Sequence, residues 1–500
     1  MTGWFGTLAP AFIAGVIMLP VLGAIILRLI VQSIWRDTVP RYGPWLIATL
    51  TLSGTAFLSI TLAITLIVDG PAVYHFGGTL LPEVVFRADT LSVTIGVLDV
   101  MLTLGILAYT YTQGPHSARF YTAYLLFTSA VFGIVLSGNL VVIFLFVLVL
   151  IGATAQLIKF GKKGDSATAA RNYVLTASAG ACVYLSGVIL AFWLGGTTDT
   201  EGLGTALSTV GYDDPFVVST FVIMSIGLAL LVALFPLHGW LVETHAKSTD
   251  PVSALISGVL PAAATYALLR VLFDVYTTGF LQENPTVTNG IIYGAVGSLI
   301  IGNVLAYGQR DIKGMLAYST ISQFGLVVAG LMVATETAVF GSVIQLFGHG
   351  IVKGAFCLVA GIIALRFDAR TLDEFGGVAT RSPVVAASFV GLGIALIGLP
   401  PTVGFVGKWY IAIAAMDQGL WIVVLFVVIS TMLTLGYVVP FIDQLYFAPF
   451  EGPDHGAETV SFPMLLVITL AVVLSLVIGL GSVLLEDALR DAIEQLIAAN

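Results

Sequence analysis

Two lysines lie deep inside apolar stretches of this chain, where a charged side chain is costly. They are Lys353 and Lys408, whereas the other seventeen of the nineteen basic residues can be placed in loops or at helix ends. A charge in hydrocarbon costs about 3 kcal/mol on insertion scales, so such a residue usually faces a wet cavity or a partner. His349 precedes Lys353 by one helical turn, and residues at this spacing share a helix face. The three side chains predict a proton path through a membrane.

A proton path needs groups that titrate near neutral pH and are joined by water or hydrogen bonds. Histidine and desolvated lysine both qualify. Gln345 lies one turn before His349 and extends the polar stripe. Three other interpretations stay open: His349 as a hydrogen-bonded histidine between helices, Lys353 in an ion pair with a carboxylate, and Lys408 as a cap for the carbonyls of a broken helix.

A second group of titratable residues follows Pro236. Glu243 is flanked by His238 and His245, and the three are expected near the cytoplasmic mouth of the chain. Proton uptake from the cytoplasm is one interpretation of this cluster. A solvated helix end is the other.

The composition predicts a polytopic, all-α membrane protein. The 500 residues are 58% hydrophobic and 9% charged, with a mean hydropathy of +1.04, whereas soluble domains are about 25% charged. The chain carries no Gly-rich nucleotide loop, nucleophile motif or metal-ligand cluster. We therefore expect no catalytic residue, no metal, no cofactor and no nucleic acid partner.

A window of about 20 apolar residues predicts about fourteen transmembrane helices. Their approximate positions are 8–31, 44–68, 89–111, 119–137, 139–159, 171–194, 216–245, 252–273, 289–307, 312–333, 336–365, 383–414, 419–446 and 460–485.

Two of these helices contain a breaker in the middle. Pro236 interrupts the span 216–245, and Pro400 and Pro401, followed by Gly404, interrupt the span 383–414. Proline removes a helical hydrogen bond, and in lipid the freed carbonyl needs another partner. Broken helices at corresponding places in two halves indicate an internal repeat whose breaks act as hinges.

The breaks divide the chain into four parts with two inverted five-helix repeats. The parts are an N-terminal three-helix segment (1–118), a first repeat (119–273), a second repeat (289–446), and a last helix with a short interfacial tail (460–500).

Basic residues in the loops predict the orientation. Fourteen lie on one side of the predicted spans, and three, Arg87, Arg270 and Arg490, lie on the other. The first side is expected to be cytoplasmic, which places both termini outside the cell membrane. The tail Leu485–Asn500 is amphipathic and predicts an interfacial helix.

Several motifs resemble one known family, the antiporter-like subunits shared by Mrp-type multisubunit sodium/proton antiporters and respiratory complex I. The likeness covers about residues 80 to 440, and within the family the chain is most similar to the Mrp D subunit. The motifs are Gln309-Arg310-Asp311-Ile312-Lys313 running into Ala317-Tyr318-Ser319-Thr320-Ile321-Ser322-Gln323, Phe235-Pro236-Leu237-His238, Pro251-Val252-Ser253-Ala254-Leu255, His349 with Lys353-Gly354, and Gly404-Phe405 with Gly407-Lys408.

The resemblance implies fourteen helices, two inverted repeats, a polar axis at mid-membrane and a place among other membrane subunits that handle protons and Na+. The chain departs from the family pattern at three places. A glutamate and two lysines expected in the first repeat align with Leu148, Leu231 and Ala262. Leucine and alanine cannot titrate, so the first half is expected to lack a proton relay.

Three functions remain in competition. The chain could translocate protons in an Mrp-type Na+/proton antiporter through its C-terminal half. It could be a non-conducting scaffold in such a complex. It could also be the equivalent subunit of a complex I-like or hydrogenase-like assembly, where it would be part of a proton-translocating NADH:quinone oxidoreductase, or of an inorganic-carbon-uptake complex.

Overall fold

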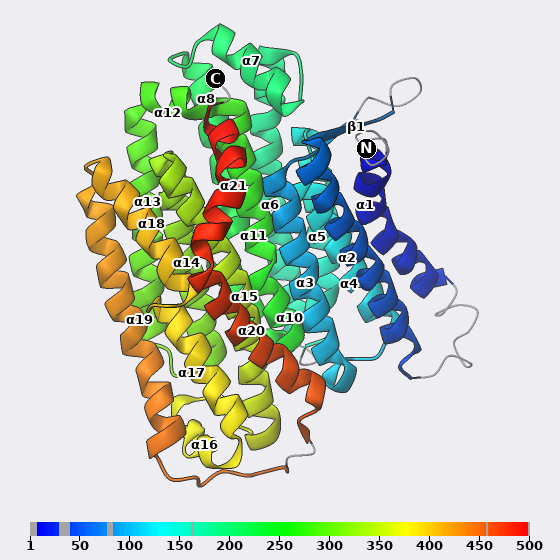
Figure 1. The fold of residues 1–500 in the computed structure, drawn as a ribbon, viewed down its shortest axis with the longest axis vertical. Helices are drawn as coiled ribbons and strands as arrows, with labels where there is room; N and C mark the ends of the chain where they lie inside the picture. The colour runs from blue at the N-terminus through cyan, green and yellow to red at the C-terminus, as the bar shows by residue number, and fades with distance from the viewer. Residues whose placement is uncertain (1–7, 30–40, 78–83, 162–164, 457–458, 499–500) are drawn as a thin grey trace.

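The computed structural model describes residues 8–29, 41–77, 84–161, 165–456 and 459–498. Within them the chain is almost entirely helical, and long helices pack side by side into one bundle (Figure 1). Thirteen helical stretches of the described chain are long and apolar enough to cross a membrane. The broken pair α17–α18 adds a further crossing, which agrees with the predicted number of about fourteen.

The N-terminal part holds three long helices and one β-hairpin. Its elements are α1 (Ala9–Ile25), α2 (Gly43–Asp69), β1 (Ala72–Phe76), β2 (Val84–Ala88) and α3 (Thr90–Gln113).

The next part contains the first broken helix. Its elements are α4 (Ala118–Val135), α5 (Leu140–Ile158), α6 (Asp165–Gly195), α7 (Thr200–Val210), α8 (Pro215–Val232), α9 (Gly239–Lys247), α10 (Asp250–Gly258), α11 (Leu260–Arg270), the π-helical turn η2 (Val271–Tyr276) and α12 (Thr277–Glu283).

The second broken helix follows, and two further helices end the chain. The elements are α13 (Pro285–Tyr307), α14 (Ile312–Val333), α15 (Glu336–Phe367), the 3-10 turn η3 (Leu372–Phe375), α16 (Val378–Arg381), α17 (Pro383–Ile397), α18 (Val403–Asp417), α19 (Trp421–Phe447), α20 (Phe462–Leu480) and α21 (Ser482–Ala498).

Both expected helix breaks are present. α8 ends at Val232 and α9 begins at Gly239, so Pro236 lies between them. α17 and α18 are separated by a turn that contains Pro400 and Pro401. Gly404 lies in the first turn of α18 instead, where an added Cβ would come within 2.0 Å of the Ala395 carbonyl oxygen on α17. Its hydrogen side chain therefore allows the two half-helices to pack closely.

Two backbone bridges recur at matching places in the two halves. Asn139, which caps α5, pairs with Asp199, which caps α7. Asp311, which caps α14, pairs with Thr371 at the start of η3. Figure 1 shows α7 at one end of the bundle and α16, which follows η3, at the opposite end. These matched features at opposite ends are consistent with the predicted inverted repeats.

Three elements add detail to the sequence expectations. β1 and β2 pair antiparallel, and residues 78–83 between them lie outside the described chain. α7 was not predicted, although Asp199 before Thr200 is an N-cap signal. In α21, Leu489, Ile493 and Leu496 are buried, and the helix packs on α15 and α3. Its apolar face is thus covered by protein.

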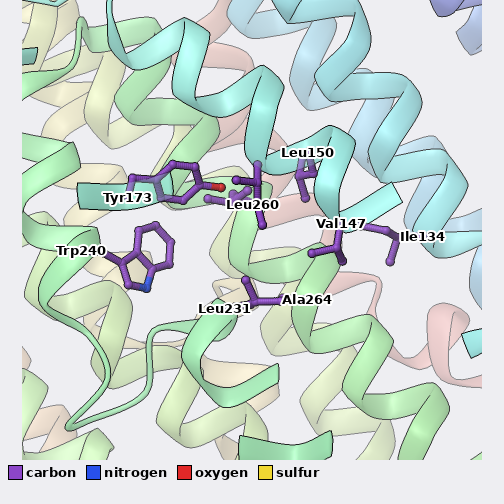
Figure 2. Close-up of a pocket in the computed structure, with 9 residues that line it drawn as sticks. Ile134, Val147, Leu150, Tyr173, Leu231, Trp240, Leu260 and Ala264 are labelled. Carbon is purple, nitrogen blue, oxygen red and sulfur yellow. The ribbon is translucent and has the colours of Figure 1, made fainter. Parts of the chain in front are cut away.

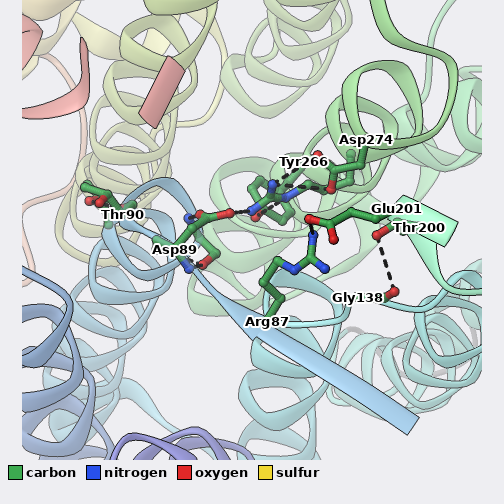
Figure 3. Close-up of polar contacts among 11 residues, drawn as sticks. Arg87, Asp89, Thr90, Gly138, Thr200, Glu201, Tyr266 and Asp274 are labelled. Carbon is green, nitrogen blue, oxygen red and sulfur yellow. Dashed lines mark hydrogen bonds and ion pairs between the residues drawn. The ribbon is translucent and has the colours of Figure 1, made fainter. Parts of the chain in front are cut away.

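A cluster of ionised side chains ties α3 to η2 at one end of the bundle (Figure 3). Asp89 caps α3 by accepting from the backbone N–H of Ser92 at 2.8 Å, and its other oxygen accepts from Arg270. Arg270 also contacts Asp274 at 3.3 Å and donates to the Tyr266 hydroxyl at 2.6 Å. The guanidinium is thus buried between two carboxylates.

We predict that Asp89→Ala destabilises the protein more than Glu201→Ala does. The first change leaves Arg270 buried with Asp274 as its remaining carboxylate, and breaking a buried pair costs about 3–5 kcal/mol. The second removes the partner of Arg87, but the Glu201 side chain is 66% exposed, and surface pairs contribute about 0–1 kcal/mol. The thermal unfolding midpoint of the detergent-solubilised protein checks the order, and equal losses would contradict it.

Candidate functional site: a polar row in the second half

The polar row is built on α15, a 32-residue helix at the centre of the bundle. In its most apolar window 94% of the residues are buried inside the protein. α14, α18 and α10 pack around it. Side chains on α15 therefore face protein on all sides, so its polar residues must find partners on neighbouring helices.

Lys353 is fully buried and contacts neutral groups on α14. Its ammonium donates to the Leu316 carbonyl oxygen at 3.0 Å and to the Ser319 hydroxyl. No carboxylate of the described residues forms an ion pair with it. Among the described residues, the alternative in which Lys353 forms an ion pair with a carboxylate is therefore wrong.

His349 is held by a backbone carbonyl on α10. Its Nε2 lies 3.1 Å from the Ser257 carbonyl oxygen. A carbonyl only accepts, so Nε2 carries the hydrogen. Pro261, four residues after Ser257, has no N–H to donate to this carbonyl, and His349 supplies the missing donor. The other ring nitrogen, Nδ1, is buried without a partner and can accept a proton.

Gln345 extends the row toward the second broken helix. Its amide nitrogen donates to Gln323 Oε1 on α14 at 2.7 Å. Gln345 Oε1 and Gln323 Nε2 are both buried without partners. Gln345 also packs against Gly407 on α18, where an added Cβ would meet Gln345 Oε1 at 2.4 Å. The two amides thus lie between the histidine and the helix that carries Lys408.

Lys408 is 4% exposed and donates to the Ile397 carbonyl oxygen at 2.8 Å. Pro401 stands four residues after Ile397 and cannot donate to that carbonyl. The lysine therefore caps a broken helix, as one of the alternatives expected. Its ammonium also lies 3.5 Å from the Thr431 hydroxyl on α19. Within the described chain Lys408 has no carboxylate partner.

Hydroxyl groups on α19 lie beside both lysines. Tyr437 lies near Ser319, and the Ser319 hydroxyl accepts from Lys353. The Tyr437 hydroxyl also lies 3.2 Å from Asn303 Oδ1 and 3.3 Å from the Thr434 hydroxyl. Thr431, which contacts Lys408, is one turn before Thr434. The cluster thus provides a second set of exchangeable hydrogens between the lysines.

The three residues expected at the cytoplasmic mouth separate in space. Glu243 accepts from Asn172 on α6 at 3.0 and 3.1 Å, and His238 stacks near Phe235 and Tyr318. Only His245 joins the row. It is fully buried, and neither ring nitrogen has a partner.

His245 connects the row to one end of the bundle. Lys313 and Lys353 both act on it electrostatically. Lys313 forms an ion pair with Asp250 Oδ1 at 2.7 Å, and Arg370, which is 42% exposed, lies 4.0 Å from the same oxygen. His245 therefore lies near both Lys313 and Lys353 but forms no side-chain hydrogen bond with either.

The buried cations fall into two classes, which the sequence did not separate. Besides the two lysines of the row, Arg270, Lys313 and Arg366 are also buried, although the sequence placed them at helix ends. Neighbouring segments cover these ends. Each of the three has a carboxylate partner, whereas Lys353 and Lys408 contact only neutral groups.

The equivalent region of the first half is apolar (Figure 2). A cavity of about 20 Å³ is lined by Ile134, Val147, Leu150, Ile151, Tyr173, Leu231, Trp240, Leu260 and Ala264. This volume suits about one water molecule, but a water needs two to four polar partners, and apolar cavities stay dry. Trp240 Nε1 is already used by the Leu230 carbonyl oxygen.

Two of the three altered family positions lie in this interior. Leu231 lines the cavity, and Ala262 is buried between Leu260 and Ala264. Leu148 is different, because it is 41% exposed and faces outward. Its neighbour Val147 is the residue of that turn which lines the cavity.

Sequence reasoning missed the neutral partners of the row. Ser257, Ser319, Gln323, Asn303 and Tyr437 are all buried. Polar residues three or four apart inside apolar helices are the signal that points to such partners. Which of them face Lys353 depends on helix rotation and crossing, which the spacing does not give.

Comparison with known families supports the motif assignment. The family described as NADH:quinone oxidoreductase/Mrp antiporter, TM, matches residues 137–434. NADH-quinone oxidoreductase subunit N of Desulforudis audaxviator is 31% identical over 449 residues, which cover 89% of this chain and 88% of the relative. The putative antiporter subunit mnhD2 of Staphylococcus aureus is 25% identical over 482 residues, 95% of this chain and 94% of the relative.

Solved structures share the fold. A chain of the Mrp complex from Dietzia sp. DQ12-45-1b superposes with a TM-score of 0.86 at 22% identity, covering 98% of both chains. A chain of respiratory complex I from Thermus thermophilus superposes with a TM-score of 0.83 at 20% identity, covering 97% of this chain and 99% of the other. The fold, the motifs and the family match agree, and the chain belongs to the NADH:quinone oxidoreductase/Mrp antiporter transmembrane family.

Proposed function

We propose that this chain is the proton-translocating, antiporter-like subunit of a multisubunit Na+/proton antiporter of Mrp type. The observation that carries the proposal is the pair Lys353 and Lys408, which are buried without carboxylate partners. An unpaired buried ammonium is strongly destabilised, so its neutral form becomes accessible and a proton can be exchanged. Paired cations elsewhere in the chain have no such reason to titrate.

Protons cross the second half along the polar row. They arrive at the surface near Asp250 and Lys313, reach Lys353 by way of His245, and continue through His349. The amides of Gln345 and Gln323 orient water between this histidine and Lys408. The break at Pro400 and Pro401 acts as the hinge that alters access to Lys408.

The first half does not conduct in this proposal. Its dry cavity and the residues Leu148, Leu231 and Ala262 offer no group that titrates near neutral pH. A neighbouring membrane subunit therefore supplies the complementary half-path and the Na+ site. The excess of basic loops on one side supports a plasma-membrane location with both termini outside.

A second candidate is the membrane arm of a complex I-like assembly. The 31% identity to an NADH-quinone oxidoreductase subunit N favours it. The site would work in the same way, with a redox module in place of the cation-exchange partners. Purification of the native complex separates the two: antiporter subunits support the first candidate, and quinone-module subunits support the second.

We predict that Lys353→Ala and Lys408→Ala abolish proton-coupled cation transport. Positioned proton-transfer groups contribute about 10²–10⁴-fold to rates, so transport should fall at least about 100-fold, to background. Lys408→Arg should fail as well, because arginine keeps its charge but does not release a proton. Fluorescent pH dyes in vesicles that carry the whole complex measure the loss.

The matched control for the lysine variants is Arg310→Gln. Arg310 pairs with Asp373 at the surface, and both side chains are about two-thirds exposed, at 66% and 67%. This variant should transport normally. Normal transport by Lys408→Ala, with the complex intact by co-purification, would instead support a non-conducting scaffold.

We predict that Leu231→Lys destabilises the protein without creating transport. The new ammonium would enter a dry cavity without a carboxylate, a change that costs several kcal/mol, on the order of 3–5. Leu231→Met keeps volume and apolarity and should cost less than about 1.5 kcal/mol. Thermal stability and yield of the assembled complex measure both changes. A stable Leu231→Lys variant with increased transport would overturn the non-conducting first half.

A further inference from the structure

A deep groove opens on the lateral surface where α1, α4 and α5 meet. Its volume is about 810 Å³. Arg28 follows the end of α1, Arg119 lies in the first turn of α4, and Lys159 caps the end of α5. The groove therefore lies at one end of these helices, opposite the end that carries the β1–β2 hairpin.

The rim of the groove is positively charged. Three of its eleven lining residues are cationic, namely Arg28, Arg119 and Lys159, and none is acidic. Among the described residues no carboxylate forms an ion pair with Arg119 or Lys159. The Thr122 hydroxyl beside them is buried without a hydrogen-bond partner. The rim thus presents positive charge to whatever fills the groove, and an unpaired hydroxyl lies buried beside it.

The floor of the groove is apolar and continues along the helices. Leu126, Val149, Gly152 and Ala153 line it, and Gln156 lies between this apolar part and Lys159. Val149 is ten residues from Lys159, which is about 15 Å along a helix. Nothing lies within 4 Å of the position that a Cβ on Gly152 would take. The groove therefore has a charged rim and an apolar floor that runs from it toward mid-membrane.

We propose that this groove binds an anionic glycerophospholipid. The phosphate of the headgroup accepts from Arg119 and Lys159, with Arg28 and the Thr122 hydroxyl beside it, since basic pockets between transmembrane helices favour anionic headgroups. An acyl chain lies along the apolar floor over Gly152. A free phosphate would leave that floor uncovered, which is why the lipid is the occupant that fits.

The test uses the assembled complex in nanodiscs of phosphatidylcholine with or without phosphatidylglycerol. We expect phosphatidylglycerol to raise the melting midpoint of the wild type and to be retained in native mass spectra. Arg119→Gln and Lys159→Gln should each weaken retention about fivefold, the factor for one basic residue near an anionic lipid surface. Gly152→Phe, which fills the floor and leaves every charge in place, should abolish lipid retention.

Arg171→Gln is the control, because it removes an exposed cation at the same end of the bundle but outside the groove. It should retain the lipid. Stabilisation by inorganic phosphate alone, or retention unaffected by Gly152→Phe, would overturn the proposal.

A photoreactive residue at Val149 gives an independent measure. An adduct with the mass of a phospholipid supports the lipid, whereas an adduct with another subunit assigns the groove to a protein interface.

Discussion

Prolines in a membrane bundle leave backbone carbonyls without their helical donors, and hydrocarbon offers no water to replace them. The polar row is organised around this constraint. Pro261 and Pro401 each free the carbonyl four residues earlier, and the donors that satisfy them are His349 and Lys408. Two groups that can carry protons are therefore fixed in place by the breaks in the helices.

Capping a carbonyl and exchanging a proton are compatible roles. A neutral amine keeps two N–H bonds, so Lys408 can lose a proton and still donate to Ile397. His349 donates through Nε2 while Nδ1 remains open. At the first broken helix the Trp240 indole donates to the Leu230 carbonyl, which also accepts from the backbone N–H of Ala233. An indole donates but does not titrate at neutral pH, so this donor cannot carry a proton.

Much of the fold follows from the sequence because hydropathy, prolines and caps act locally. The spans, both breaks and the cap at Asp89 are read from residues near one another in the chain. The rotation of each helix is set by distant contacts. Lys313 was therefore placed at a helix end, although neighbouring segments bury it beside Asp250. The sequence also does not predict the neutral partners of Lys353, because they depend on the same helix rotations.

The small apolar void at Val147 and Leu231 has an electrical consequence. A membrane potential of 100 mV supplies about 2.3 kcal/mol for each elementary charge that crosses. Moving a bare ion into a region of low dielectric costs more, several kcal/mol even after the protein relaxes. In the proposed function this half of the chain is therefore the insulating half, which keeps ions from leaking beside the path in the second half.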